Sequence, residues 1–179
     1  MRFATPVTLL AAISGTCAMV IQRDNPLAKC INSVTSSLNK LDVATKSFNG
    51  DIQPVVEAAD NVIATIQHGQ MVTDGTPSIG LFSAAALLQP VQILDNRAKV
   101  LFVDVKGRVL DVQKAKKCDV TRAKLSTLNF VGHKLIDTIL NKISSGFARN
   151  IARPFTDDIK GLLAKSLDLF EGARCVDAY

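Results

Sequence analysis

The sequence is poor in the residues that build catalytic and metal centres. It has no Trp and only two His, His68 and His133, which lie far apart in the chain. Neither histidine belongs to a His-Glu-x-x-His pattern or lies near a cysteine at metal-ligand spacing. A Gly-x-Ser-x-Gly nucleophile motif, a Gly-rich phosphate loop and a dinucleotide fingerprint are also missing. We therefore expect no enzyme activity, no metal and no cofactor.

One adjacent pair of carboxylates, Asp157 and Asp158, is a weak candidate for acid/base chemistry. Neighbouring residues on a helix point about 100° apart, so the two carboxyl groups do not converge on one substrate. We expect both in the first turn of a helix that starts near Pro154, where acids interact favourably with the helix dipole.

Charge of one sign is not abundant either. The net charge is +5, and only 21% of the residues are charged, which is not the density of a nucleic-acid-binding protein. Most of the excess lies in Arg97, Lys99, Lys106, Arg108, Lys114, Lys116, Lys117, Arg122 and Lys124, opposed in that stretch by Asp104, Asp111 and Asp119. A solvated helical face is favoured, with a patch for anionic headgroups, a fatty-acid carboxylate or an acidic wall polymer as the alternative.

The amino terminus has the features of a secretory signal peptide. Arg2 precedes the short apolar run 7–13, and small residues around 15–18 permit cleavage after Ala18. A membrane anchor is disfavoured because a span needs about 20 predominantly apolar residues. The sequence thus predicts a signal peptide at 1–18 and one domain at 19–179, without a transmembrane segment. The mature chain is expected to be secreted and extracellular.

Apolar residues recur at helical spacing through the rest of the chain. From Leu27 to Phe48 they alternate at intervals of four and three, which places them on one helical stripe. The predicted helices cover residues 27–48, 52–68, 79–117, 121–144 and 151–173. Asp51 can cap the second helix, and Pro90 is expected to bend the third. Only 100–105 is ambiguous with a strand. We predict an all-α, up-down bundle of about five amphipathic helices with a long Pro-kinked third helix.

Cysteine is scarce, and Cys17 leaves with the signal peptide. Cys30, Cys118 and Cys175 remain, so a monomer can form at most one disulfide. In an up-down bundle of five helices, Cys118 and Cys175 lie at the same pole, with Cys30 at the other. The topology therefore favours a Cys118–Cys175 disulfide and leaves Cys30 free or intermolecular.

Three segments carry a resemblance to a known family: the helix at 30–42 (CINSVTSSLNKLD), LSTL at 125–128 and IKGLL at 159–163. With the signal peptide and the Pro-interrupted helix, they resemble the fungal hydrophobic-surface-binding proteins, which include cell-wall galactomannoproteins. The resemblance implies a secreted helical domain that adsorbs to hydrophobic surfaces or captures fatty acids in a central cavity. The chain departs from many such proteins by lacking a Ser/Thr-rich tail, which favours free secretion over attachment to the cell wall.

The periodic pattern alone favours an ordinary solid core, because any helical bundle needs aliphatic stripes that face inward. Only the resemblance favours a lipid-binding interior. On that hypothesis the lipid is a fatty acid, and twelve residues line the interior: Leu38, Leu41, Ile63, Ile66, Leu101, Val105, Leu128, Leu135, Ile139, Phe155, Ile159 and Leu162. The alternative is a secreted effector or cell-wall protein with a solid core and a protein or polysaccharide partner.

Overall fold

The structure is a computed structural model that describes residues 25–177. The predicted signal peptide at 1–18 lies outside this range, so the division of the chain stays a prediction. The helices are α1 (Pro26–Lys46), α2 (Gln53–Gly75), α3 (Leu81–Ala85), α4 (Leu88–Gly107), α5 (Val109–Lys114), α6 (Cys118–Lys142), α7 (Gly146–Asp168) and a 3-10 turn, η1 (Gly172–Arg174). Within 25–177 the only extended pairing is a single bridge between Ile79 and Ile143. The predicted all-α fold is confirmed, and 100–105 is helical.

The first helix starts at a complete cap. The Asn25 side chain accepts the backbone N–H groups of Leu27 at 3.0 Å and Ala28 at 3.4 Å, and Pro26 occupies the first helical position. The predicted stripe of α1 is buried, with Leu27, Ile31, Val34 and Leu41 all at 5% exposure or less. This face of α1 therefore forms one wall of the core.

The second helix runs further than the sequence pattern predicts. Pro54 lies in its first turn as expected, but the N-cap residue is Ile52 and not Asp51. Asp51 precedes the cap, and its Oδ1 accepts the Gln53 N–H at 3.0 Å. The helix continues past Gly69, where we expected it to fade, to Gly75. A Cβ atom at residue 69 would lie 2.3 Å from Cys30 Sγ on α1. Gly69 thus permits close helix packing and does not end the helix.

The segment predicted as one bent helix over 79–117 is divided into α3, α4 and α5. The first division lies at residues 86–87, ahead of Pro90, which is the third residue of α4. In a first turn the missing N–H of proline is harmless, so Pro90 is compatible with a new helix start. The second division lies at Arg108, directly after Gly107.

The last long helix starts earlier than predicted. Ser145 caps it by accepting the Ala148 N–H at 3.3 Å, and Pro154 lies inside the helix. Asp157 and Asp158 are therefore in the middle of α7, and our placement of them in a first turn is wrong. Both carboxylates lie on exposed residues, and Lys99 bonds to Asp158 at 3.0 Å.

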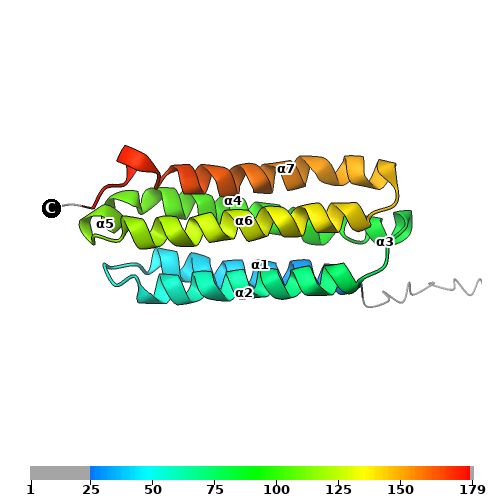
Figure 1. The fold of residues 1–179 in the computed structure, drawn as a ribbon, viewed down its shortest axis with the longest axis horizontal. Helices are drawn as coiled ribbons and strands as arrows, with labels where there is room; N and C mark the ends of the chain where they lie inside the picture. Colours follow the sequence, from blue (N-terminus) through cyan, green and yellow to red (C-terminus); the bar gives the residue numbers. More distant parts are fainter. Residues whose placement is uncertain (1–24, 178–179) are drawn as a thin grey trace, which may run out of the picture.

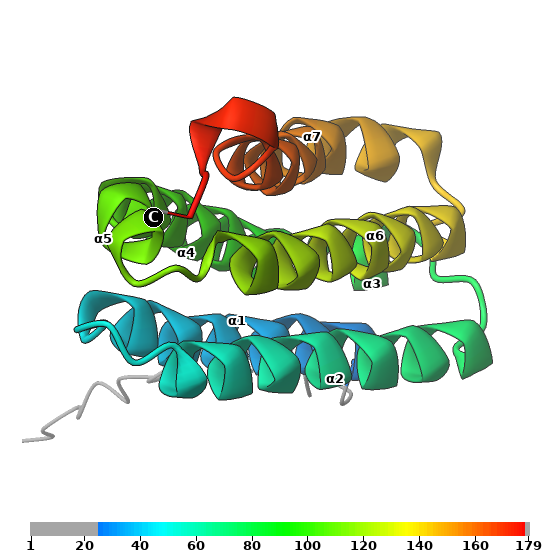
Figure 2. The same cartoon turned by 60° about the vertical axis from the view of Figure 1, so that its left-hand side comes forward.

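Five long helices close into a ring. Consecutive long helices run in opposite directions, as the colours in Figure 1 show. Figure 2 shows α1 and α2 in a lower layer, α4 and α6 above them, and α7 on top. The principal contacts join α1 to α2, α2 to α6, α6 to α7, α7 to α4, and α4 back to α1. If neighbouring helix axes are about 9 Å apart, each helix axis in a ring of five lies about 7.7 Å from the central axis of the bundle. In a ring of four the same distance is about 6.4 Å. The central axis of a ring of five is thus harder to fill with side chains.

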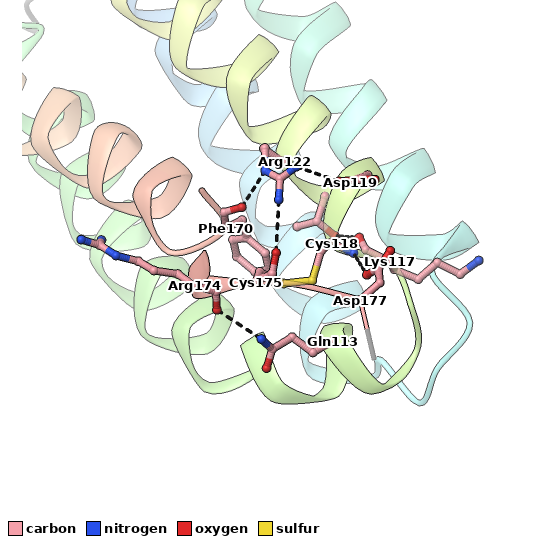
Figure 3. The surroundings of a disulfide bond; sticks show 10 residues. Gln113, Lys117, Cys118, Asp119, Arg122, Phe170, Arg174, Cys175 and Asp177 are labelled. Atoms are coloured by element: carbon pink, nitrogen blue, oxygen red, sulfur yellow. Dashed lines mark hydrogen bonds and ion pairs between the residues drawn. A yellow bond between two sulfur atoms is a disulfide. The ribbon is translucent and has the colours of Figure 1, made fainter. Parts of the chain in front are cut away.

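A disulfide joins Cys118, the first residue of α6, to Cys175 after η1 (Figure 3). Arg122 holds the same segment by donating to the carbonyl oxygens of Phe170 at 2.7 Å and Cys175 at 3.2 Å. Asp177 accepts the Cys118 N–H at 2.8 Å. This is the pair that the topology favours, and the chain after α7 is fixed to the start of α6.

Candidate functional site

An apolar cavity of about 110 Å³ lies along the axis of the ring, and we call it the central cavity. All five long helices contribute to its wall. It is lined by Val34, Leu38, Leu41, Val62, Ile66, Leu94, Ala98, Leu101, Val105, Leu125, Leu128, Gly132, Leu135, Ile136, Ile159, Leu162, Leu163 and Ser166. A cavity of roughly 150 Å³ with aliphatic walls is enough to hold a benzene molecule. The interior therefore has room for part of an apolar ligand before any side chain moves.

Nine of the twelve residues proposed from the sequence line the central cavity: Leu38, Leu41, Ile66, Leu101, Val105, Leu128, Leu135, Ile159 and Leu162. The other three lie elsewhere. Ile139 lines a second cavity, Ile63 packs against the core around the central cavity, and Phe155 packs against the cluster of Leu27, Ile31, Leu87 and Val91.

Sequence reasoning missed half of the central cavity's lining. The residues it left out are Val34, Val62, Leu94, Ala98, Leu125, Gly132, Ile136, Leu163 and Ser166. Seven of these residues occupy positions on the predicted helical stripes, so the stripes could have identified them: Val34, Leu94, Ala98, Leu125, Gly132, Ile136 and Ser166. Val62 and Leu163 lie outside the predicted stripe positions.

The polar groups at the central cavity are few and already engaged. Ser166 donates its hydroxyl hydrogen to the Leu162 carbonyl oxygen at 2.8 Å. Gly132 leaves room for Leu163, since a Cβ there would lie 2.7 Å from Leu163 Cδ1. No charged residue of the described chain lines the cavity. It is suited to a hydrocarbon chain, because a buried, unpaired charge would be costly.

A second apolar cavity, of about 120 Å³, lies between α3, α4, α6 and α7 at the end of the bundle, and we call it the outer cavity. Its lining is Leu81, Ala84, Ala85, Leu87, Leu88, Val91, Ile139, Leu140, Ile143, Phe147, Ala148, Ile151, Ala152 and Thr156. Three of these side chains are substantially exposed, Phe147 at 67%, Leu81 at 44% and Ile151 at 41%. The outer cavity therefore has an apolar rim at the molecular surface.

The two histidines lie apart from both cavity linings. His68 is exposed on α2, and His133 on α6 has its Nε2 atom 3.4 Å from the Lys160 carbonyl oxygen. Within residues 25–177 no group of three or more His, Cys, Asp or Glu side chains could hold a metal ion.

Basic residues at 97–124 are partly balanced by acids from other helices. Lys99 bonds to Asp95 at 2.7 Å and to Asp158 on α7 at 3.0 Å, and hydrogen bonds to these two carboxylates raise the pKa of Lys99. Lys124 reaches Asp60 on α2 at 2.6 Å. These ion pairs across helices agree with a solvated face more than with a free cationic patch.

No helix among the described residues has both the length and the apolar character needed to cross a bilayer.

The fold and the cavities define a class of protein, a ring of helices around an apolar interior. The comparison with family models specifies it further. Residues 25–141 match the model of the hydrophobic surface binding protein A family, so the chain belongs to that family. No curated protein sequence matches the chain.

Solved structures share this fold at low sequence identity. Ligand binding domain 1 of the Penicillium marneffei MP1 protein, complexed with arachidonic acids, is 17% identical with a TM-score of 0.78 over 83% of this chain and 98% of that one. Domain 2, complexed with multiple arachidonic acids, is 21% identical with a TM-score of 0.79 over 83% and 96%. AFMP4P in complex with palmitic acid is 12% identical with a TM-score of 0.74 over 81% and 97%. The likeness establishes the fold.

Proposed function

We propose that this protein is a secreted, non-enzymatic binder of fatty acids that buries the acyl chain in the central cavity. The observation that carries the proposal is the aliphatic, uncharged wall of that cavity, to which all five long helices contribute. The fold shared with MP1 domains and AFMP4P, whose structures contain arachidonic or palmitic acid, supports a fatty acid as the ligand. The signal-peptide pattern at 1–18 supports secretion.

Burial of the acyl chain supplies the affinity. Each methylene group transferred from water to the cavity contributes about 0.8 kcal/mol, less the cost of ordering the chain and of moving side chains. The carboxylate is expected to stay at the solvent end, because the lining offers no charged partner and a buried carboxylate would lose its hydration.

Filling the central cavity tests this proposal. Ala98 lines the cavity on α4, so Ala98→Phe should occupy the space of two or three methylene groups and weaken palmitate binding by roughly 10- to 100-fold. Displacement of a fluorescent fatty acid from the full mature chain measures the affinity. The matched control is Ala164→Phe, on the exposed side of α7, which should bind as the unchanged protein does. Equal affinity for both variants, or no saturable binding by the unchanged protein, contradicts the proposal.

Adsorption to hydrophobic surfaces is a second candidate function. It is favoured by large apolar side chains in contact with solvent, above all Phe82 at 91% exposure on α3 and Phe147 at 67% on α7. Replacing both by Ser should reduce adsorption of the protein to polystyrene beads. The control is Phe130→Ser on α6, where the phenylalanine is 71% exposed. This variant measures the effect of losing an exposed aromatic ring elsewhere on the molecule.

A further inference from the structure

The two cavities follow one another along the same inward faces of three helices. On α4 the outer cavity is lined as far as Val91, and the central cavity begins at Leu94. On α6 the corresponding residues are Ile139 and Ile136. On α7 they are Thr156 and Ile159. Each step is three residues, which is about 4.5 Å along a helix. The cavities are therefore consecutive spaces on one axis, separated by less than one helical turn.

Side chains, and not backbone, separate the two spaces, because the three helices run alongside both. Leu94 and Ile139 pack against the core around the central cavity and also against the cluster of Leu27, Ile31, Leu87 and Val91. Phe155, on α7 next to Thr156 of the outer lining, packs against the same cluster. We call Leu94, Ile139 and Phe155 the partition. Rotamer changes at these residues would connect the cavities without moving a helix.

Length also distinguishes the two spaces. Along α6 the central cavity extends from Leu125 to Ile136, and both cavities together extend from Leu125 to Ile143. At a rise of 1.5 Å per residue these spans are about 16 Å and about 27 Å. One leaflet of acyl chains is about 15 Å thick, half of a hydrocarbon core of about 30 Å. A chain longer than the central cavity would have to cross the partition.

We propose that the outer and central cavities form one acyl channel. The partition sets the acyl-chain length beyond which additional methylene groups no longer increase the affinity. This inference rests on the proposed function. The outer cavity holds the part of the acyl chain that extends beyond the central cavity. Its lining is suited to that role, since Thr156 is the only polar residue there and the exposed rim residues Leu81, Phe147 and Ile151 open the space to solvent.

Changing the size of the partition tests the proposal. Affinities of the mature protein for saturated fatty acids from octanoic to docosanoic acid are measured by displacement of a fluorescent fatty acid. For the unchanged protein the affinity should rise about fourfold for each methylene that becomes buried and then level off. Ile139→Ala should shift the point at which the affinity levels off to longer acids. It should tighten binding of the longest acids by roughly 15-fold, as expected for about two further buried methylenes. Ile139→Phe should shift that point to shorter acids.

The matched control is Ile63→Ala, the same change at a half-buried residue that packs against the core but lines neither cavity. This variant should leave unchanged the acyl-chain length at which the affinity stops rising. Circular dichroism verifies that each variant is helical, and Ile139→Val gives the same test with a smaller shift if Ile139→Ala does not fold.

The outcomes separate the two proposals. If the unchanged protein binds no acid of any length, the proposed function fails, and the acyl channel fails with it. If it binds but levels off at the same length in all variants, or if Ile139→Ala alters the affinity for all acids equally, only the acyl channel is overturned.

Discussion

Two glycines in helix interiors have opposite surroundings, although the sequence gives no sign of the difference. Gly69 on α2 faces Cys30 on α1 so closely that there is no room for another carbon atom, whereas Gly161 on α7 has no neighbouring heavy atom within 4 Å of a built Cβ. Packing thus requires glycine at the first position, while the second carries only its conformational cost. Residue type alone could not separate these roles, because the contact lies between residues distant in the chain.

We predict that Gly69→Ala lowers the free energy of unfolding by about 1–3 kcal/mol, because the new methyl group must displace Cys30 Sγ or separate α1 from α2. Urea denaturation followed by circular dichroism measures the change. Adding Cys30→Ala should restore part of the loss by removing the sulfur atom. Gly161→Ala is the control and should raise the stability by about 0.5–1 kcal/mol. Equal effects at the two sites would contradict this account of Gly69.

The buried thiol of Cys30 differs from the cysteines at the opposite end of the bundle. Burial raises the pKa of the Cys30 thiol, and a hydrogen bond with Thr73 offsets part of that shift. A thiol of this kind reacts slowly, since the thiolate is the nucleophile. Because the folded-state pKa is raised, the group's contribution to stability is present below the unfolded-state pKa and is lost as the pH rises through the folded-state value.

At the scale of elements, proline and glycine were the least reliable signals in the sequence. Pro90 was predicted to bend a long helix, but it lies in the first turn of a separate one. Pro154 was predicted near a helix start, but it lies inside α7. Asn150, whose carbonyl group is left without the N–H that proline lacks, is exposed, so this carbonyl can reach water. A proline restricts the backbone in the same way in a first turn and inside a helix. The packing of the neighbouring residues decides whether the helix begins there or continues through the proline.

The disulfide fixes the segment after α7, where Phe170 and Cys175 are buried in a cluster with Phe48 and Val112. Cys118 and Cys175 are separated by 57 positions, and chain-entropy arguments give about 4 kcal/mol for closing a loop of that length. We predict that replacing both residues by Ser lowers the free energy of unfolding by about 2–5 kcal/mol. Chemical denaturation measures the loss, and Cys30→Ser distinguishes it from the effect of removing any cysteine.

A peptide map under non-reducing conditions checks the pairing itself. It should recover Cys118 linked to Cys175, with the thiol of Cys30 available to alkylation after unfolding. A fragment linking Cys30 to either partner would refute both the pairing and the stability argument.

At the scale of the whole molecule, the ring of helices leaves the interior underfilled, and this has a thermodynamic consequence. A ligand that binds only the folded state stabilises it by about 2.7 kcal/mol at a concentration 100 times its Kd. Palmitate should therefore raise the Tm of the delipidated protein in calorimetry. Hexanoic acid should raise it much less, because it buries fewer methylene groups.

The Ala98→Phe variant provides the internal control for that measurement. With its central cavity filled, it should lose most of the palmitate-dependent rise in Tm. An equal rise in the variant would place the fatty acid outside the central cavity.

The sequence by itself determined the helical class, the faces that turn inward and the pair of cysteines that share a pole. Hydrophobic periodicity reports the direction of each side chain around its own helix, so nine of the twelve proposed residues do line the central cavity. Periodicity carries no information on how far apart the facing helices stand. That distance follows from closing five helices into a ring, in which α4 packs back against α1. Only the tertiary structure could therefore decide between a solid core and two consecutive cavities, because the unfilled space depends on the geometry of all five helices together.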